Sequence, residues 1–334
     1  MTNIIIKRER WVDYFKAMLV LAMILGHSIQ FFGEESKMLQ GLVVRSVNLI
    51  SFSGFIFAYG YVINKAYFEK GFRNSFRRMM TSGLKILGAY YISSISFIAL
   101  MENQIFRVDT VLDVVLLKRF AGWSEFLIAF VLFILLSIIF FRFFEKVNQY
   151  VLLVLMVVSL LSCFLSYSWI TTPRSALILG SYDYITFPVI QYSFWFFLGI
   201  FFSRNKKQAE KYLFLLSIIA TGSYIIYSFV TKQEPSRFPP SPIYILGGAA
   251  ILYIFRWLSY QIEYCHLKHE FLRKIIKYLE SVGKSSLYYL LISNIMIFGF
   301  AQSSFSYRDG RYAIIFYIAL MIVSRFIQIL SKTT

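Results

Sequence analysis

The sequence contains few charged residues, few prolines and almost no cysteine. Of its 334 residues only 15% are charged, against roughly 25% in an average soluble domain. The six prolines form no low-complexity linker, and the two cysteines, Cys163 and Cys265, lack the spacing of metal ligands. A glycine-rich nucleotide loop and the Ser-His-Asp order of a hydrolase are also missing. We therefore expect no metal, no tightly bound cofactor and no separate soluble domain.

Apolar residues are what the sequence has in excess. Hydrophobic residues make up 58% of the chain, in runs near the roughly 20 residues that an α-helix needs to cross a bilayer. Backbone groups in lipid must be satisfied internally, which allows only helices or a closed barrel. The runs are continuous rather than alternating, which excludes the barrel. The sequence predicts an all-α, polytopic transmembrane helical bundle, with residues 1–334 as a single domain.

Hydropathy predicts about ten membrane spans. The first run follows the basic residues KRER, but it is long and lacks a small-residue cleavage site, so we expect it to remain as a span. The predicted spans cover residues 11–32, 41–63, 80–101, 123–141, 150–167, 185–203, 212–231, 242–260, 285–302 and 312–330.

The basic residues are concentrated in alternate connectors between these spans. One set of connectors holds about twice the Lys and Arg of the other, which predicts that this set and both termini are cytoplasmic. The net charge of +17 therefore indicates membrane topology, and we expect no nucleic-acid partner. Residues 263–284 are predicted to form an amphipathic helix at the inner surface, because Leu267, Phe271, Ile275 and Leu279 recur at helical spacing.

Two polar residues flank an apolar stretch in the first span, KAMLVLAMILGHS. Lys16 and His27 are eleven residues apart, so both project from one helix face about 16 Å apart along the axis. An ionisable residue inside a span is a functional candidate, because its burial is costly. A structural interpretation is also open: Lys16 can extend to the interface, and His27 can form a hydrogen bond between helices.

The segment ERWVDYFKAMLVLAMILGH resembles the first helix of the acyltransferase 3 family of membrane proteins. Arg10, Asp13, Lys16 and His27 occupy the positions of that family's R-x-x-D-x-x-R/K motif and of the His that follows after ten residues. Further segments resemble the family in the same order along nearly the whole chain: FSGFIFAYGYVIN, WSEFLIAF, FWFFLGIFF, RFPPSPIYIL and GKSSLYYLL. Two positions differ: the spacing of Arg73, Arg77, Arg78 and Lys85 departs from the family's arginine pair, and Ser293 stands where many members have His.

The resemblance implies transfer of an acyl group, most often acetyl, from acyl-CoA to a hydroxyl of an extracytoplasmic or lipid-linked glycan. The chain would then be an acetyl-CoA-dependent O-acetyltransferase with acetyl-CoA as its donor substrate. High Phe, Ile, Tyr and Lys usage is typical of an AT-rich genome, so we expect a multi-pass protein of a bacterial cytoplasmic membrane, in contact with membrane lipids. A homo-oligomer is compatible with the sequence. The expected cations for the CoA phosphates are Lys16, Arg10, Arg73, Arg77 and Arg78.

His27 has two open roles, general base toward the acceptor hydroxyl or nucleophile that forms an acyl-imidazole, and we favour the base. Glu125 is the candidate carboxylate that orients its imidazole. Trp123 and Arg237 are candidate acceptor-binding residues. Asp13 is expected to pair with Lys16, and Ser53 with Gly54 to permit close helix packing.

Two other functions remain open. A glycan exporter or transporter without acyl-transfer chemistry would also have many spans, although such proteins favour broken helices in corresponding halves, and this sequence shows no such symmetry. An acyltransferase-like scaffold that has lost activity is the third alternative, because Ser293 replaces the late His.

Overall fold

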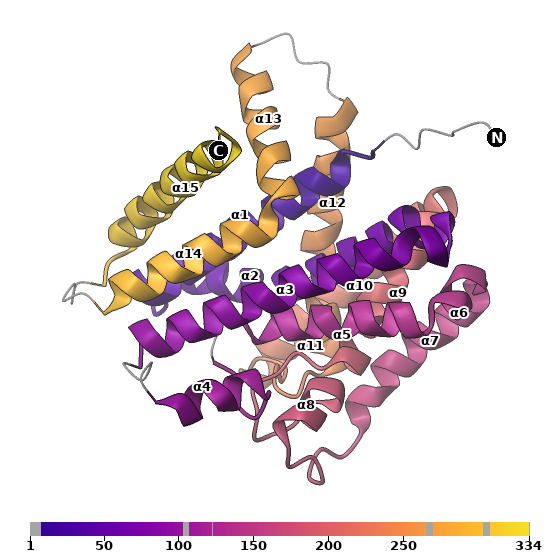
Figure 1. The fold of residues 1–334 in the computed structure, drawn as a ribbon. Coiled ribbons are helices and arrows are strands. Elements are labelled where there is room, and N and C mark those ends of the chain that lie inside the picture. The colour runs from indigo at the N-terminus through magenta and orange to yellow at the C-terminus, as the bar shows by residue number, and fades with distance from the viewer. Residues whose placement is uncertain (1–7, 103–106, 122, 265–269, 303–307, 334) are drawn as a thin grey trace.

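The structure is a computed structural model that describes residues 8–333 apart from 103–106, 122, 265–269 and 303–307. In this part of the chain every regular element is a helix, and the only β-pairing is an isolated bridge between Arg237 and Pro240. Cys265 and Leu267 lie outside the described residues, so the expectations about them stay predictions. The predicted all-helical architecture is confirmed (Figure 1).

Each predicted span corresponds to a helix or to two consecutive helices. Six are long and apolar enough to cross a membrane, namely α1, α2, α3, α10, the pair α11–α12, and α15, and α5, α7 and α14 are shorter apolar helices. The number of crossings stays a prediction. The bounds are α1 Trp11–Phe32, α2 Met38–Ala66, α3 Phe72–Leu100, α5 Glu125–Ile139, α7 Gln149–Leu161, α9 Val189–Arg204, α10 Lys206–Thr231, α11 Pro242–Gly247, α12 Ala249–Tyr264, α14 Ser286–Ala301 and α15 Gly310–Thr333.

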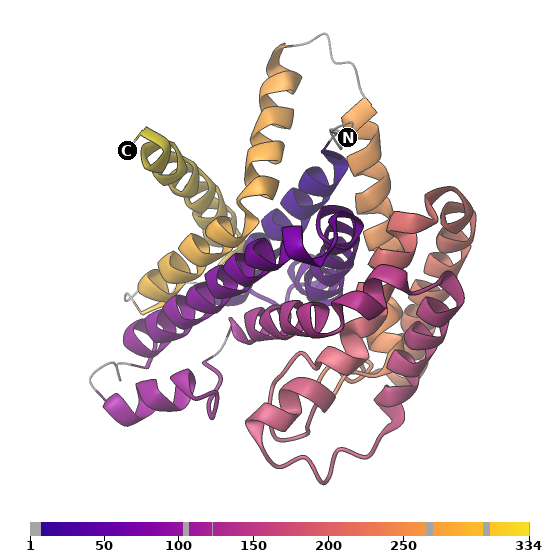
Figure 2. The same cartoon turned by 45° about the vertical axis from the view of Figure 1, so that its right-hand side comes forward.

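Shorter helices connect these elements, and one of the connecting helices, α13, lies across two helices of the predicted spans. Both views show α13 running transverse to α1 and α14 (Figures 1 and 2). Of the stripe predicted on residues 263–284, Phe271 and Ile275 on α13 are exposed, whereas Leu279 packs against the apolar core. Glu263 belongs to α12, so the predicted helix corresponds only in part to α13, and its position at the membrane surface stays a prediction. The connecting helices are η1 Phe68–Lys70, α4 Val108–Val115, α6 Phe141–Lys146, η2 Ser162–Phe164, α8 Pro173–Leu179 and α13 Glu270–Lys284.

Helix α1 lies at the centre of the bundle, against α2, α12, α13, α14 and α15. Its contact with α2 depends on Gly54, since a Cβ there would lie 2.8 Å from Leu19 and 2.7 Å from Leu252. Ser53 beside it is buried. This is the close helix packing expected of Ser53 and Gly54, because small residues let apolar helices approach.

The start of α1 is anchored by acidic residues at one end of the bundle. Glu263 on α12 accepts hydrogen bonds of 3.1 Å from the backbone N–H groups of Arg10 and Trp11, which satisfies two donors that a helix start leaves unpaired. The last turns of α15 lie at the same end, where Arg325 donates to Ser281 on α13. We call this end, at which α1 begins and α15 finishes, the basic end; the opposite end is the pocket end.

Candidate functional site

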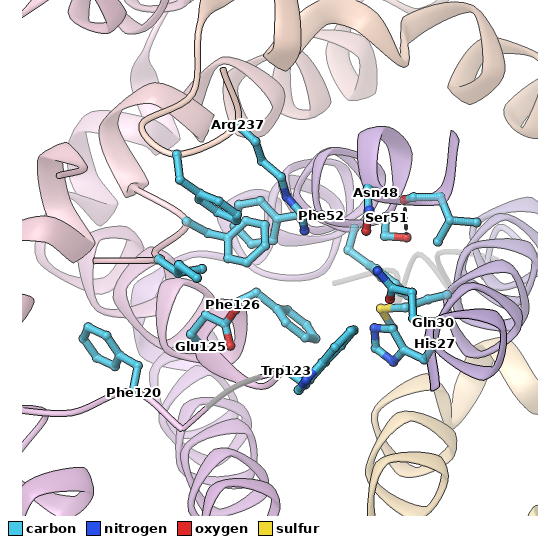
Figure 3. Close-up of a pocket in the computed structure, with 16 residues that line it drawn as sticks. His27, Gln30, Asn48, Ser51, Phe52, Phe120, Trp123, Glu125, Phe126 and Arg237 are labelled. Carbon is cyan, nitrogen blue, oxygen red and sulfur yellow. Dashed lines mark hydrogen bonds between the residues drawn. The ribbon is translucent and has the colours of Figure 1, made fainter. Parts of the chain in front are cut away.

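A pocket of about 340 Å³ opens at the pocket end of the bundle, among α1, α2, the start of α5 and three loops (Figure 3). Its volume is at the lower end of the roughly 300–1,000 Å³ found for small-molecule sites. Polar side chains project into it from an otherwise aromatic and aliphatic wall. The polar lining residues are His27, Gln30, Asn48, Ser51, Glu125 and Arg237, and the aromatic ones are Phe52, Phe55, Phe120, Trp123, Phe126, Phe187 and Phe238.

Four residues singled out in the sequence meet in this pocket: His27, Trp123, Glu125 and Arg237. They come from α1, from the residues that open α5, and from the loop between α10 and α11. Nothing in their sequence positions requires this meeting, because the most distant two are separated by 210 residues (237 minus 27). The structure brings together the proposed catalytic and acceptor-binding residues, whereas their chemical roles stay predictions.

The His27 imidazole has two close neighbours. The indole ring of Trp123 stands edge-on to it, with ring centroids 4.8 Å apart and an angle of 83° between the planes. The second neighbour is the Asn294 side chain of α14, which lies near the imidazole. Asn294 Oδ1 is buried without a hydrogen-bond partner, so this oxygen is available to accept an imidazole N–H after a small reorientation. An acceptor on one ring nitrogen fixes the tautomer and leaves the other nitrogen for chemistry.

Asn294 is itself held by a buried hydrogen-bond network. Its Nδ2 donates to Ser93 Oγ on α3 at 3.3 Å, and the hydroxyls of Ser93 and Ser124 are hydrogen-bonded to each other. Ser93, Ser124 and Asn294 are all buried. The network connects α14, α3 and the N-cap of α5, and thereby fixes three helices around His27.

Sequence reasoning did not identify Asn294 or this network. The detectable signal was the occurrence of Asn and Ser inside apolar spans, where polar side chains commonly hydrogen-bond between helices. Ser293, which replaces the family's late His, is buried and donates only to the Leu290 carbonyl oxygen of its own helix, at 2.8 Å. The polar neighbour of His27 is instead Asn294, the residue that follows Ser293.

Trp123 adopts an unusual backbone conformation. Its φ of 73° lies in the left-handed region, which bulky residues rarely occupy. Such a conformation costs on the order of 1–3 kcal/mol and persists only when the surroundings impose it. Contacts with His27 and with Phe31, whose ring centroid is 4.9 Å away, hold the indole in place.

Glu125 lies in the same pocket but is oriented by the start of α5. It is the first residue of α5, where a carboxylate complements the positive end of the helix dipole. Its Oε2 is buried and without a hydrogen-bond partner. In Figure 3 Trp123 stands between Glu125 and His27. The polar side chain found beside the imidazole is that of Asn294, in the place where the sequence led us to expect Glu125.

Lys16 lies toward the basic end and does not line the pocket. Its Nζ is 3.2 Å from Asp13 Oδ1, the pairing that the spacing of three residues predicts, and Arg8 binds the same carboxylate at 2.8 Å. Between Lys16 and His27, Val20 and Ile24 are fully buried in an apolar cluster. Lys16 and His27, predicted to project from one helix face, are thus separated on that face by apolar packing.

The four arginines expected to contact CoA phosphates are all exposed and lie toward the basic end. Arg10 immediately precedes α1, and Arg73, Arg77 and Arg78 occupy the first turns of α3. The end of α2 is held beside the start of α1 by the 2.5 Å hydrogen bond from Tyr61 to Glu9, so α3, which follows α2, also begins there. None of the four lines the pocket around His27.

Within the described ranges, no group of three or more His, Cys, Asp or Glu side chains could hold a metal ion. The comparisons with known proteins gave one match. Residues 9–328 match the family model described as an acyltransferase domain. No curated protein and no solved structure matches the chain.

Proposed function

Because the chain belongs to the acyltransferase 3 family, we propose that this membrane acyltransferase moves an acetyl group from cytoplasmic acetyl-CoA to a hydroxyl of an extracytoplasmic or lipid-linked glycan. The observation that carries the proposal is the pocket that joins His27 to Trp123, Glu125 and Arg237. It combines a group able to accept a proton with aromatic faces on which a sugar ring can stack, and a cation and an anion that can orient a polar ligand.

In the proposed reaction His27 acts as a general base. Its unprotonated ring nitrogen removes the proton from the acceptor hydroxyl while that oxygen attacks the thioester carbonyl carbon of acetyl-CoA. The tetrahedral intermediate then collapses: the carbon–sulfur bond breaks, and the CoA thiolate takes the proton back from the imidazolium. The products are the acetyl ester of the sugar and free CoA. If the Asn294 oxygen accepts one imidazole N–H, the second nitrogen is left available to the hydroxyl.

The proposed donor path runs from the basic end toward His27. Positive charges at the start of α1 and α3 complement the phosphates of CoA, and the pantetheine arm would extend along the bundle. Met23, which lies one helical turn from His27, lines the pocket on the side of the basic end. Val20 and Ile24 fill the intervening space, so donor binding would require these packed side chains to move apart.

The decisive experiment measures turnover of labelled acetyl-CoA by the purified protein in lipid nanodiscs, with and without a panel of glycans. His27→Ala should reduce CoA release and label transfer by at least 100-fold, because general-base catalysis contributes about 10²–10⁴-fold. Ser28→Ala is the matched control, since its hydroxyl is buried and only donates to the Ile24 carbonyl of its own helix.

The same preparation separates the alternatives. Movement of a glycan into vesicles without release of CoA would favour an exporter. Absence of turnover by the wild type, although it still binds acetyl-CoA, would favour an inactive scaffold. An acetyl group found covalently attached to His27 before acceptor is added would replace the general base by the nucleophilic route.

A further inference from the structure

The guanidinium of Arg237 forms no ion pair with any described residue in the pocket, although the carboxylate of Glu125 lines the same pocket. In the described part of the chain no carboxylate is paired with it, and its Nε is buried without a hydrogen-bond partner. Glu234 in the same loop is already bound by Arg45 at 2.8 Å. Glu125, the one acidic residue that lines the pocket, lies close enough to interact with the charge of Arg237 but forms no ion pair with it.

The loop that carries Arg237 is stiffened by its own hydrogen bonds. Ser236 Oγ donates to the Pro239 carbonyl oxygen at 2.7 Å, and the N–H of Ser241 donates to the Ser236 carbonyl oxygen at 2.9 Å. The guanidinium lies over the Phe238 ring, 4.8 Å from its centroid. In Figure 3 the side chain extends from this loop toward Ser51 and Asn48. The unpaired cation is therefore presented to the pocket in a defined position.

An arginine side chain stays charged in proteins, and leaving its charge partly buried without a partner is costly. The cost is recovered when a ligand brings an anion, and a planar guanidinium matches a carboxylate or a phosphate in a two-bonded arrangement. We propose that the acyl acceptor is an anionic glycan, and that Arg237 binds a carboxylate or phosphate group carried by the sugar whose hydroxyl is acylated. This inference rests on the proposed function and names the acceptor class for the same site.

The position of Arg237 argues for the acceptor rather than for the CoA part of the donor. The cations expected for the CoA phosphates lie toward the basic end, whereas Arg237 lies at the pocket end. The pocket volume of about 340 Å³ leaves room for one sugar ring and its substituent beside Trp123. An acetyl group is neutral and offers no anion to Arg237. A succinyl donor would carry a carboxylate of its own. The experiment therefore has to distinguish a carboxylate on the donor from an anionic group on the acceptor.

The test compares three sugars that differ in charge: methyl glucoside, methyl glucuronide and methyl glucoside 6-phosphate. Their binding to the intact protein in nanodiscs is measured at constant ionic strength by thermal stabilisation and by competition with acetyl-CoA-dependent labelling of glycans. Wild type should bind at least one charged sugar at least tenfold more tightly than the neutral one. Arg237→Gln should weaken binding of that charged sugar by about 10- to 100-fold, the effect of removing a charge-assisted hydrogen bond, and leave the neutral sugar within twofold.

Two variants control for charge and folding. Arg45→Gln removes a cation paired with the same loop but outside the pocket, and it should leave the preference intact. Arg237→Lys keeps the charge without the planar fork and should retain part of it. Equal binding of all three sugars by the wild type, or binding of none, overturns the proposal.

A parallel measurement with succinyl-CoA identifies the other source of a carboxylate. If Arg237→Gln impairs use of succinyl-CoA but not of acetyl-CoA, and sugar binding is unchanged, Arg237 recognises the donor and the proposal is wrong. Failure of the proposed function gives a different pattern: no variant, including His27→Ala, would alter acetyl-CoA turnover, while the preference for charged sugars would persist. The two hypotheses therefore fail separately.

Discussion

The indole of Trp123 meets the His27 imidazole edge-on, at a centroid distance of 4.8 Å. The two residues belong to segments that are separated by most of a hundred residues, and Trp123 occupies a strained backbone conformation to make this contact. The contact limits how the imidazole can turn and forms one wall of the pocket. An aromatic pair of this geometry contributes about 0.5–1.5 kcal/mol beyond simple burial.

Replacement of Trp123 tests this wall. Trp123→Ala should lower kcat/KM for acyl transfer by roughly 2- to 10-fold, because the pair energy of about 0.5–1.5 kcal/mol is lost. Trp123→Phe keeps an aromatic ring and should lose less. Steady-state kinetics on the purified variants gives the result, with Trp169→Ala, an exposed tryptophan outside the pocket, as control. A Trp123→Ala variant with wild-type kinetics would remove the indole from the mechanism.

Asn294 should act as a positioning residue for His27. Asn294→Leu removes the oxygen that we expect to accept the imidazole N–H and should lower kcat by about 10-fold or more, while the KM for acetyl-CoA stays near the wild-type value. Asn294→Asp keeps an acceptor oxygen and should restore part of kcat with an altered pH–rate profile. Ser293→Ala is the adjacent control, since its hydroxyl donates only within its own helix.

Partial recovery of kcat in Asn294→Asp would separate a role in positioning His27 from a role in stability alone. If Asn294→Asp and Asn294→Leu lose the same activity and unfold at the same lowered temperature, the residue serves only the packing of α14 against α3.

The Lys16→Ala variant tests the proposal that Lys16 anchors the acyl donor. Acetyl-CoA should raise the Tm of the wild type and raise that of Lys16→Ala by a clearly smaller increment. The increment is the relevant measurement, because removal of Lys16 also weakens the pairing of the buried Asp13 carboxylate and lowers the starting Tm. Lys37→Ala, which removes an exposed lysine paired with Glu34 at the pocket end, is the control. Equal increments for all three proteins would exclude a role for Lys16 in donor binding.

Glu9 predicts a pH dependence of stability at the basic end. Burial acts to raise the pKa of its carboxyl, but hydrogen bonds from Tyr61 at 2.5 Å and Trp11 at 2.7 Å and the nearby Lys206 charge outweigh it, so the pKa is lowered. A lowered pKa in the folded state contributes stability above the ordinary carboxyl pKa of about 4.3, and this contribution disappears as pH falls through the folded value.

Glu9→Gln should therefore lower the free energy of unfolding by about 1 kcal/mol at neutral pH, a value reduced for the partial exposure of the site. The difference from wild type should shrink as pH decreases below about 4. Thermal unfolding across this range measures both effects, with Glu270→Gln, an exposed glutamate on α13, as control. A difference that is independent of pH would show that the carboxylate charge does not contribute.

The sequence identified most candidate residues of the site, but it did not predict how they are arranged. His27 and Lys16 stood out because polar residues in an apolar span are costly, and the family motif added Arg10 and Asp13. Asn294 did not stand out, since an amide in a span more often serves helix packing than chemistry. Helical periodicity predicts that Lys16 and His27 share one helix face, but it does not show that Val20 and Ile24 pack into an apolar cluster between them.

The sequence by itself determined the helices, because hydropathy and hydrogen bonding within a segment are local properties of the chain. It also determined which residues could carry proton transfer and which could bind phosphate. Only the tertiary structure decided that His27, Trp123, Glu125 and Arg237 share one pocket and that Asn294 faces the imidazole. In lipid the outer and inner faces of a helix are similarly apolar, so sequence pattern does not specify which helices become neighbours. Close packing at residues such as Gly54 and the buried network of Ser93, Ser124 and Asn294 make that choice.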